Sequence, residues 1–142
     1  MRDLPRINWT DIVAEMKKML IAEDEVHARE ALVAFFESQG FEVRCAADGQ
    51  QALRIGNEFV PDVLITDWLL EGECSGVGVA RALARALPHT AIILVSGYPM
   101  AELRAITADL EVEAYMEKPI SLFELNAVVE RAAQKEAAKT TT

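Results

Sequence analysis

From Lys18 onward, short apolar runs alternate with longer stretches of helical period, and this alternation is the strongest constraint on the fold. Five of the runs have the length and composition of β-strands. They span residues 18–22, 41–46, 62–66, 91–95 and 113–116. Two of them, 62–66 and 91–95, are apolar without alternation, as expected for parallel strands buried on both faces. Each run precedes a stretch with helical spacing of its apolar residues, so the sequence predicts five strand–helix units.

Helix signals mark the ends of the intervening stretches. Gly40 follows the first predicted helix as a natural C-terminal stop. Asp48 and Ser121 are each followed three residues later by the partner of a capping box. Pro99 suits the first turn of a helix that we expect to run to about residue 109. These signals support the division into alternating strands and helices.

Alternating strands and helices imply right-handed crossovers and a parallel sheet that is covered on both faces. We therefore predict a doubly wound α/β sandwich, with five strands in the flavodoxin-like order 2-1-3-4-5 and five helices. A length of 142 residues suits a single domain. We place this domain at residues 18–136, between an N-terminal extension or linker at 1–17 and a C-terminal tail at 137–142.

The charge balance disfavours several kinds of partner. Fourteen basic and 23 acidic residues give a net charge of -9, which repels nucleic-acid phosphates and anionic membrane surfaces. Cys45 and Cys74 form no pattern typical of a disulfide framework or a zinc site. No apolar run approaches the roughly 20 residues that span a bilayer, and the first residues lack the apolar stretch of a secretory signal. We expect a cytoplasmic protein with no direct nucleic-acid or membrane partner.

Polar side chains of complementary chemistry follow four of the predicted strands. In chain order they are Glu23 and Asp24, Asp67, Ser96, and Lys118. In an open parallel sheet the functional crevice lies beyond the carboxyl ends of the strands. The first, third, fourth and fifth strands are neighbours in the expected order. The sequence therefore predicts that carboxylates, a hydroxyl and an ammonium gather at one edge of the sheet.

A cluster of this kind suits phosphoryl transfer assisted by a divalent cation. Carboxylates held close together repel one another, which raises at least one pKa unless a cation offsets their charge. Hard oxygen ligands suit Mg²⁺. A carboxylate is a competent nucleophile for phosphoryl transfer and gives an aspartyl phosphate. An ammonium and a hydroxyl can then contact the phosphoryl oxygens.

Four segments carry these side chains in order along the chain. They are MLIAEDE at 19–25, PDVLITD at 61–67, IILVSG at 92–97 and YMEKP at 115–119. Together they closely resemble the receiver domains of bacterial response regulators, including the chemotaxis receivers, over about residues 18–135. The resemblance implies two-component phosphorelay signalling. It also implies a phosphoacceptor that assists its own phosphorylation and dephosphorylation, rather than an enzyme.

The resemblance assigns a role to each acidic position. Asp67 is the expected phosphoacceptor. Glu23 and Asp24 are expected to bind Mg²⁺ directly or through water, together with Asp67. The main-chain carbonyl of Leu69 would complete the protein's share of the metal coordination.

The resemblance also assigns the switch residues. Ser96 and Lys118 are expected to contact the phosphoryl group, with Ser96 swinging toward it. Tyr115 occupies the aromatic switch position, whose ring moves together with Ser96. Pro119 is the candidate for a cis peptide bond after Lys118.

The partners are implied by the resemblance alone. The expected phosphoryl donor is a histidine kinase or a histidine phosphotransfer protein. The expected output is a change in the face formed by the helix at 99–109, the strand at 113–116 and the last helix. A downstream protein partner would bind this face, and a homodimer is a further option. A stand-alone protein and a piece of a larger regulator both remain open.

The loop after Asp67 departs from the family pattern. Glu71 stands where many receivers have proline, and the loop to Gly76 is about one residue longer. One alternative is therefore a receiver-fold interaction module that works without phosphorylation. A second is a small-molecule phosphohydrolase that forms an aspartyl phosphate. The phosphohydrolase alternative is disfavoured by comparison with haloacid-dehalogenase-type phosphatases. Those enzymes need a cap domain and a second aspartate at the position where this chain has Leu69.

Overall fold

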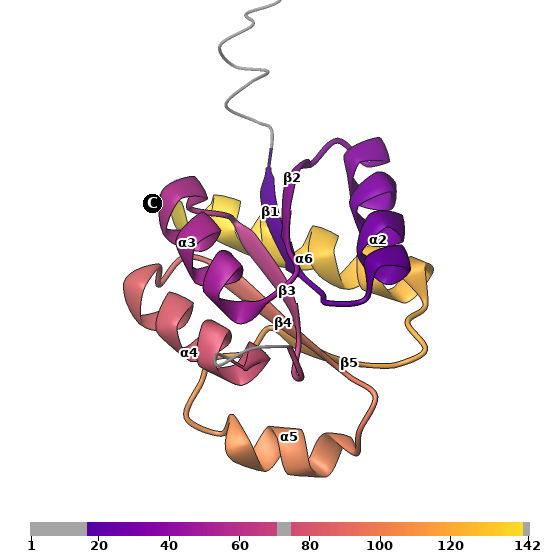
Figure 1. The fold of residues 1–142 in the computed structure, drawn as a ribbon. Coiled ribbons are helices and arrows are strands. Elements are labelled where there is room, and N and C mark those ends of the chain that lie inside the picture. The colour runs from indigo at the N-terminus through magenta and orange to yellow at the C-terminus, as the bar shows by residue number, and fades with distance from the viewer. Residues whose placement is uncertain (1–16, 71–74, 141–142) are drawn as a thin grey trace, which may run out of the picture.

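The computed structural model describes residues 17–70 and 75–140, with side chains up to residue 135. It shows a sheet flanked by helices, with the chain entering the sheet at its first strand (Figure 1). The predicted extension before residue 17, and the loop residues Glu71 and Cys74, lie outside these ranges.

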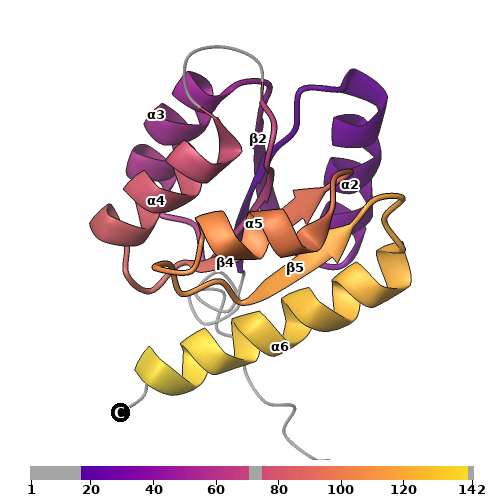
Figure 2. The ribbon, with the colours of Figure 1, turned by 90° about the horizontal axis from the view of Figure 1, so that it is seen from below.

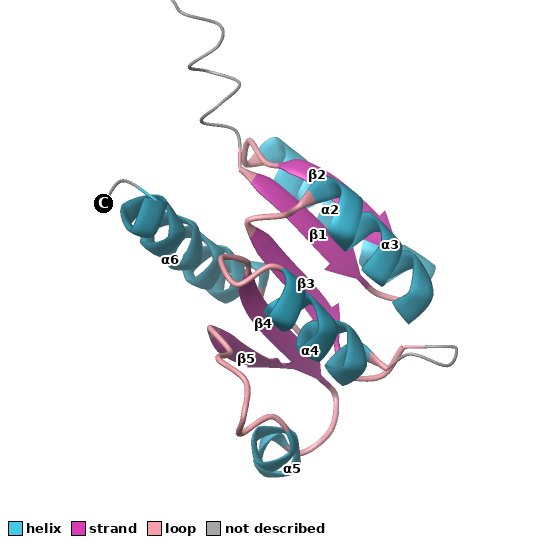
Figure 3. Ribbon diagram, turned by 90° about the vertical axis from the view of Figure 1, so that its left-hand side faces the viewer, coloured by secondary structure: helices cyan, strands magenta, loops and turns pink. Residues whose placement is uncertain are grey.

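All five predicted strands are present and run parallel. They are β1 (Lys18–Ala22), β2 (Glu42–Ala46), β3 (Val63–Asp67), β4 (Ala91–Ser96) and β5 (Ala114–Glu117). Their order in the sheet is β2-β1-β3-β4-β5, which confirms the predicted topology (Figure 3). Because the strands are parallel, all of their carboxyl ends lie at one edge of the sheet.

Helices cover both faces of the sheet (Figure 2). They are α2 (Val26–Ser38), α3 (Gly49–Phe59), α4 (Gly76–Ala86), α5 (Met100–Ile106) and α6 (Leu122–Thr140). One core cluster joins α3, α4 and α5 to the sheet face that carries Leu20 and Leu64. The other joins α2 and α6 to the opposite face, which carries Ile21 and Ile65. Successive residues of a strand therefore pack into different cores, each contributing about 1.5–3 kcal/mol on burial.

Burial along each strand follows its place in the sheet. Every residue of β3 and β4 is buried, which accounts for the uninterrupted apolar runs in their sequence. β2 lies at an edge and exposes Glu42, Arg44 and Cys45. The central strands thus form a rigid base for the residues at their carboxyl ends.

The predicted helix caps are confirmed. The side chain of Asp48 accepts a hydrogen bond from the Gln51 N–H at 2.8 Å. Gln51 in return accepts one from the Ala47 N–H at 3.2 Å. At the start of α6, the Ser121 hydroxyl accepts the Glu124 N–H at 3.3 Å. Each cap satisfies a backbone donor that the helix itself leaves free.

One predicted helix end is wrong, and the last helix extends further than the predicted domain boundary. α5 stops at Ile106 rather than near residue 109. The chain turns there, because the Leu110 N–H donates to the Thr107 carbonyl at 2.9 Å. α6 continues to Thr140, into the segment 137–142 that we expected to be a tail. Glu136, Ala137, Ala138 and Lys139 are strong helix formers, which explains the continuation.

Val60, the residue that ends α3, has a left-handed backbone with φ 51° and ψ 69°. A β-branched side chain is strained in this conformation, whereas glycine adopts it without cost. Val60 is also 52% exposed, so little packing is lost by truncation. We expect Val60→Gly to raise the free energy of unfolding by about 0.5–1 kcal/mol. Urea denaturation measures the change. Val60→Ala, which keeps a Cβ atom, should give less, and a larger gain for alanine would contradict the strain argument.

Candidate functional site

The polar residues predicted to converge do lie at one edge of the sheet. Asp67 is the last residue of β3, and Ser96 is the last residue of β4. Glu23 directly follows β1, and Lys118 directly follows β5. β1 and β4 pair with β3 on either side, so Asp67 stands at the centre of this edge.

The ammonium of Lys118 lies against two buried carboxylates. It donates a hydrogen bond to Asp67 Oδ2 and lies 3.4 Å from Glu23 Oε1. Glu23 is 4% exposed and Asp67 is 8% exposed. Two buried carboxyl groups, those of Glu23 and Asp67, therefore share one ammonium as their partner.

The charges at this cluster shift two pKa values. Burial, together with the neighbouring Asp67 carboxylate, raises the pKa of Glu23 to about 7 despite the opposing effect of Lys118. Burial alone would lower the pKa of Lys118, but the hydrogen bond and charge of Asp67, followed by those of Glu23, raise it above its ordinary value. At Glu23, burial therefore outweighs the stabilising charge of Lys118.

The turn between β1 and α2 is held by residues that the sequence analysis did not single out. The Arg29 guanidinium donates to the carbonyls of Glu23 at 2.9 Å and Asp24 at 3.3 Å. Glu25 caps α2 by accepting the backbone N–H groups of His27 and Ala28. Arg29 carries no sequence signal for this role, because its reach back to the preceding turn depends on its rotamer.

The backbone after Asp67 is fixed by close contacts. The Leu69 N–H donates to Asp67 Oδ1 at 3.0 Å, and the Gly76 N–H donates to the Trp68 carbonyl at 3.0 Å. A Cβ atom on Gly76 would lie 1.6 Å from the carbonyl oxygen of Asp67. Gly76 is therefore required for α4 to begin directly against the end of β3. In the sequence, this contact is marked only by the placing of Gly76 directly after Ser75, the residue that caps α4.

The hydroxyl of Ser96 does not contact Asp67 in this structure. It accepts the Tyr98 N–H at 2.9 Å and lies 3.3 Å from the Tyr98 carbonyl, to which it donates. Ser96 itself is completely buried. The structure thus brings Ser96 to the expected strand end but directs its side chain into the following turn.

Tyr115 is half-buried on β5 and packs against the core that contains Leu103. Its hydroxyl lies 2.7 Å from the hydroxyl of Thr107, which itself donates to the Leu103 carbonyl. The Arg104 guanidinium lies 4.3 Å from the centre of the Tyr115 ring. Tyr115 is therefore tied to the C-terminal end of α5, and neither Thr107 nor Arg104 was predicted to contact it.

The backbone around Lys118 is also held to the site. The Lys118 N–H donates to the Ser96 carbonyl at 2.8 Å. The Lys118–Pro119 peptide bond is cis, which is the isomer that the resemblance implies.

Comparison with known families decides the class of this protein. A family model described as the response regulator receiver domain matches residues 19–130. The chain belongs to this family. The match spans the whole cluster of Glu23, Asp67, Ser96 and Lys118, and the sheet order is the receiver order.

Individual relatives agree with the family match. The receiver chain is 32% identical to the regulatory protein AtoC of Escherichia coli over 124 residues, which is 87% of this chain and 27% of AtoC. It is 25% identical to a response regulator receiver domain from Clostridium thermocellum, with a TM-score of 0.80 over 87% of this chain and 98% of the other. It is 26% identical to TrrA of Thermotoga maritima, whose structure is a complex with Mg²⁺ and BeF. That comparison has a TM-score of 0.73 and covers 82% of this chain and 99% of TrrA.

Membership of this family carries a general function. Receiver domains accept a phosphoryl group on an aspartate from histidine kinases, so this chain acts in two-component phosphorelay signalling. The chain spans about a quarter of the length of AtoC and of an NtrX-like response regulator of Rickettsia bellii. Other curated relatives are named as transcriptional regulators, such as PfeR of Pseudomonas aeruginosa, of which the chain covers 39%.

The receiver family binds Mg²⁺ beside its phosphorylation site, and the donors of this chain can be tested for that ion. Within residues 17–70 and 75–140, no three His, Cys, Asp or Glu side chains gather closely enough to hold a metal. Lys118 bridges Glu23 and Asp67, while Asp24 is half-buried and is not gathered with them. Burial is the main cause of the raised pKa of Glu23, followed by its hydrogen bond with Asp67. The buried carboxylate oxygens of Glu23 and Asp67 are hard donors, which suit a divalent cation.

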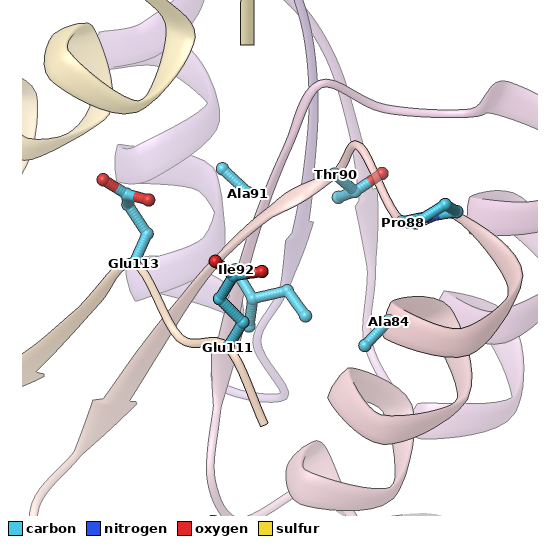
Figure 4. A pocket seen from close by; sticks show the side chains of 7 residues that line it. All are labelled: Ala84, Pro88, Thr90, Ala91, Ile92, Glu111 and Glu113. Carbon is cyan, nitrogen blue, oxygen red and sulfur yellow. The ribbon is translucent and has the colours of Figure 1, made fainter. Parts of the chain in front are cut away.

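A small cavity lies away from the Asp67 site. It has a volume of about 130 Å³ and is lined by Ala84, Pro88, Thr90, Ala91, Ile92, Glu111 and Glu113 (Figure 4). It opens beside the start of β4, at the opposite end of that strand from Ser96. The Thr90 hydroxyl donates to the Pro61 carbonyl at 2.6 Å, and Glu113 pairs with Lys135 at 3.2 Å. These polar groups therefore serve the packing of the domain.

Among the residues that the structure describes, no helix combines the length and apolar character needed to cross a bilayer.

Proposed function

We propose that Asp67 is the phosphoacceptor of this receiver, with Mg²⁺ held by Glu23, Asp24, Asp67 and the main-chain carbonyl of Leu69. The observation that carries the proposal is the pairing of buried Asp67 with Lys118 beside buried Glu23. An isolated structural aspartate at a strand end would need neither a second buried carboxylate nor a shared ammonium.

The transfer step uses groups of this chain in distinct roles. A carboxylate oxygen of Asp67 attacks the phosphorus of a phosphohistidine, the new P–O bond forms, and the P–N bond to the imidazole breaks. When bound beside Asp67, Mg²⁺ would supply positive charge to the phosphoryl oxygens. The Lys118 ammonium supplies further positive charge, and the Leu69 N–H orients the carboxylate. The domain thereby assists its own phosphorylation and is not an enzyme acting on a separate substrate.

Switching follows from the charge and acceptor oxygens that the phosphoryl group adds. Ser96 turns toward these oxygens, and Tyr115 changes its contacts in response. Because Tyr115 is bound to Thr107 at the end of α5, its motion changes the face formed by α5, β5 and α6. We propose that a downstream protein binds this face, or that two copies of the chain pair through it.

A groove beside the site suits the approach of the phosphoryl donor. It has a volume of about 430 Å³, runs between α2 and the start of α6, and is lined by Glu23, Glu25, Ala28, Ala31, Leu32, Lys118, Pro119, Ile120 and Leu122. Two of these residues, Glu23 and Lys118, belong to the Asp67 cluster, so a protein seated in the groove reaches the acceptor. Phe123 follows Leu122 in the chain and exposes 86% of its surface. We propose that the histidine-containing donor protein docks on this surface.

Phe123→Ala should then slow phosphotransfer from a phosphorylated histidine kinase or phosphotransfer protein by about tenfold, because exposed aromatic anchors dominate docking energies. Phosphorylation by acetyl phosphate should not change, since this small donor needs no docking surface. The matched control is Ile106→Ala, which removes an exposed apolar side chain from α5. Equal loss with both donors would show that Phe123 acts on the fold or the chemistry instead.

The decisive test of the proposed function is intact mass after incubation with acetyl phosphate or phosphoramidate and Mg²⁺. The wild type should gain one phosphoryl group, and Asp67→Asn should gain none. Omitting Mg²⁺ should also prevent the gain. Asp109→Asn, in the turn after α5, is the control and should be phosphorylated normally. A folded wild-type protein that gains no phosphoryl group from any donor would favour the phosphorylation-independent interaction module.

A further inference from the structure

The turn after β4 holds the hydroxyl of Ser96 through a single residue. The Tyr98 N–H donates to Ser96 Oγ at 2.9 Å, and Ser96 Oγ donates to the Tyr98 carbonyl at 3.3 Å. A serine hydroxyl has one hydrogen to donate. Ser96 therefore cannot donate to an oxygen on Asp67 until its bond to the Tyr98 carbonyl is broken.

The side chain of Tyr98 is held in turn by the residue next to Asp67. Its ring meets the Trp68 ring edge to face, with centroids 6.0 Å apart and an angle of 85° between the ring planes. The Trp68 N–H donates to the Val95 carbonyl at 2.8 Å, so Trp68 is anchored to β4. The ring pair thus connects the segment after Asp67 to the turn that binds the Ser96 hydroxyl.

We propose that Tyr98 is a positioning residue for Ser96. Its ring, seated on Trp68, keeps the turn in the conformation that binds the Ser96 hydroxyl away from Asp67. The phosphoryl group must overcome this hold before Ser96 can reach it. The inference rests on the proposed function, because it concerns how readily the Asp67 site accepts a phosphoryl group.

The exposure of Tyr98 explains why the ring controls this step. Tyr98 is 54% exposed, so its ring has little packing besides the contact with Trp68. The interaction that opposes release of the Ser96 hydroxyl is then mainly the aromatic contact between Tyr98 and Trp68. Edge-to-face pairs of this kind change an equilibrium by about two- to tenfold. If the site binds its ligand only when Ser96 is released, the apparent affinity equals the intrinsic affinity multiplied by the fraction of molecules in the released state. A larger released fraction therefore means tighter apparent binding.

The test is a titration with beryllofluoride, a phosphoryl analogue, in the presence of Mg²⁺. The chain has two tryptophans, Trp9 and Trp68, so a Trp9→Phe background leaves Trp68 as the sole fluorescent reporter. Tyr98→Leu removes the aromatic contact and should lower the beryllofluoride midpoint by about two- to tenfold. Tyr98→Phe keeps the ring and should restore the wild-type midpoint. The midpoint, rather than the amplitude, is compared, because Tyr98 is itself a neighbour of Trp68.

A double-mutant comparison of Tyr98 and Ser96 separates positioning of Ser96 from a general effect of Tyr98 on the fold. In a Ser96→Ala background there is no hydroxyl to hold, so Tyr98→Leu should leave the midpoint unchanged. The inference is overturned if Tyr98→Leu does not tighten binding in the presence of Ser96, or tightens it equally in the Ser96→Ala background. A wild-type chain that shows no saturable response to beryllofluoride would count against the proposed function itself. The two failures are therefore distinguishable.

Discussion

Replacing Gly76 by alanine is expected to lower the free energy of unfolding by about 2–3 kcal/mol and to slow phosphorylation of Asp67 by roughly 10²-fold. The added Cβ atom would lie 1.6 Å from the Asp67 carbonyl oxygen and 2.9 Å from that of Trp68. Both obstacles are backbone atoms, which cannot rotate away as a flexible side chain would. Either the end of β3, which carries the Asp67 carboxylate, or the first turn of α4 must move, and we expect part of the shift to fall on Asp67.

The matched control is Gly97→Ala, on the turn beside Ser96. A Cβ atom there would lie 3.9 Å from the Lys118 Cδ, which is an ordinary contact. Urea denaturation gives the stability change, and intact mass over time with acetyl phosphate and Mg²⁺ gives the rate. Wild-type stability and rate in Gly76→Ala would show that the segment between Asp67 and α4 adapts freely. Equal losses in Gly97→Ala would show that any alanine near the site is harmful.

The order of the sheet and the convergence of Asp67 with Lys118 could be predicted because burial leaves a direct record in the sequence. Strands such as β3 and β4 are buried on both faces, so their residues are almost all apolar, and they end on the polar residues Asp67 and Ser96. Parallel pairing then brings those ends together regardless of their distance along the chain.

The orientation of the polar side chains could not be predicted from the sequence in the same way. The sequence placed Ser96 at the site, but its hydroxyl bonds to the Tyr98 backbone. It grouped Asp24 with Glu23 and Asp67, whereas Lys118 bridges only the latter two. Each outcome is decided by rotamers and local hydrogen bonds of the kind that short polar side chains make with nearby backbone. Such choices differ by a few kcal/mol and follow no periodic pattern.

The ends of helices were predicted with mixed success for a related reason. The cap at Asp48 has a fixed sequence spacing and was predictable. The stop of α5 at Ile106 depends on a turn closed by Thr107 and Leu110, and neither residue type is a strong stop signal. A helix end without glycine or proline is therefore visible only in the folded chain.

Lys118→Met is expected to slow phosphorylation of Asp67 by acetyl phosphate by about 10²- to 10³-fold, which is the usual cost of losing one preorganised charge at a reacting oxyanion. Lys118 is the shared partner of Asp67 and Glu23, so its removal leaves two buried carboxylates facing each other. Their repulsion should raise the pKa of Glu23 further above its ordinary value. The approaching phosphoryl group, itself anionic, then meets a site with more negative charge and one fewer donor.

Lys118→Arg and Lys135→Met complete this experiment. Arginine keeps the charge but replaces a compact ammonium with a planar fork, so we expect partial recovery at best. Lys135 forms an exposed ion pair with Glu113 at 3.2 Å on another part of the surface, and its loss should leave the rate unchanged. Initial rates from intact mass, compared at equal folded fraction, separate chemistry from stability. If Lys118→Met kept the wild-type rate, the ammonium would serve only to neutralise the buried carboxylates. The charge that stabilises transfer would then have to come from the metal alone.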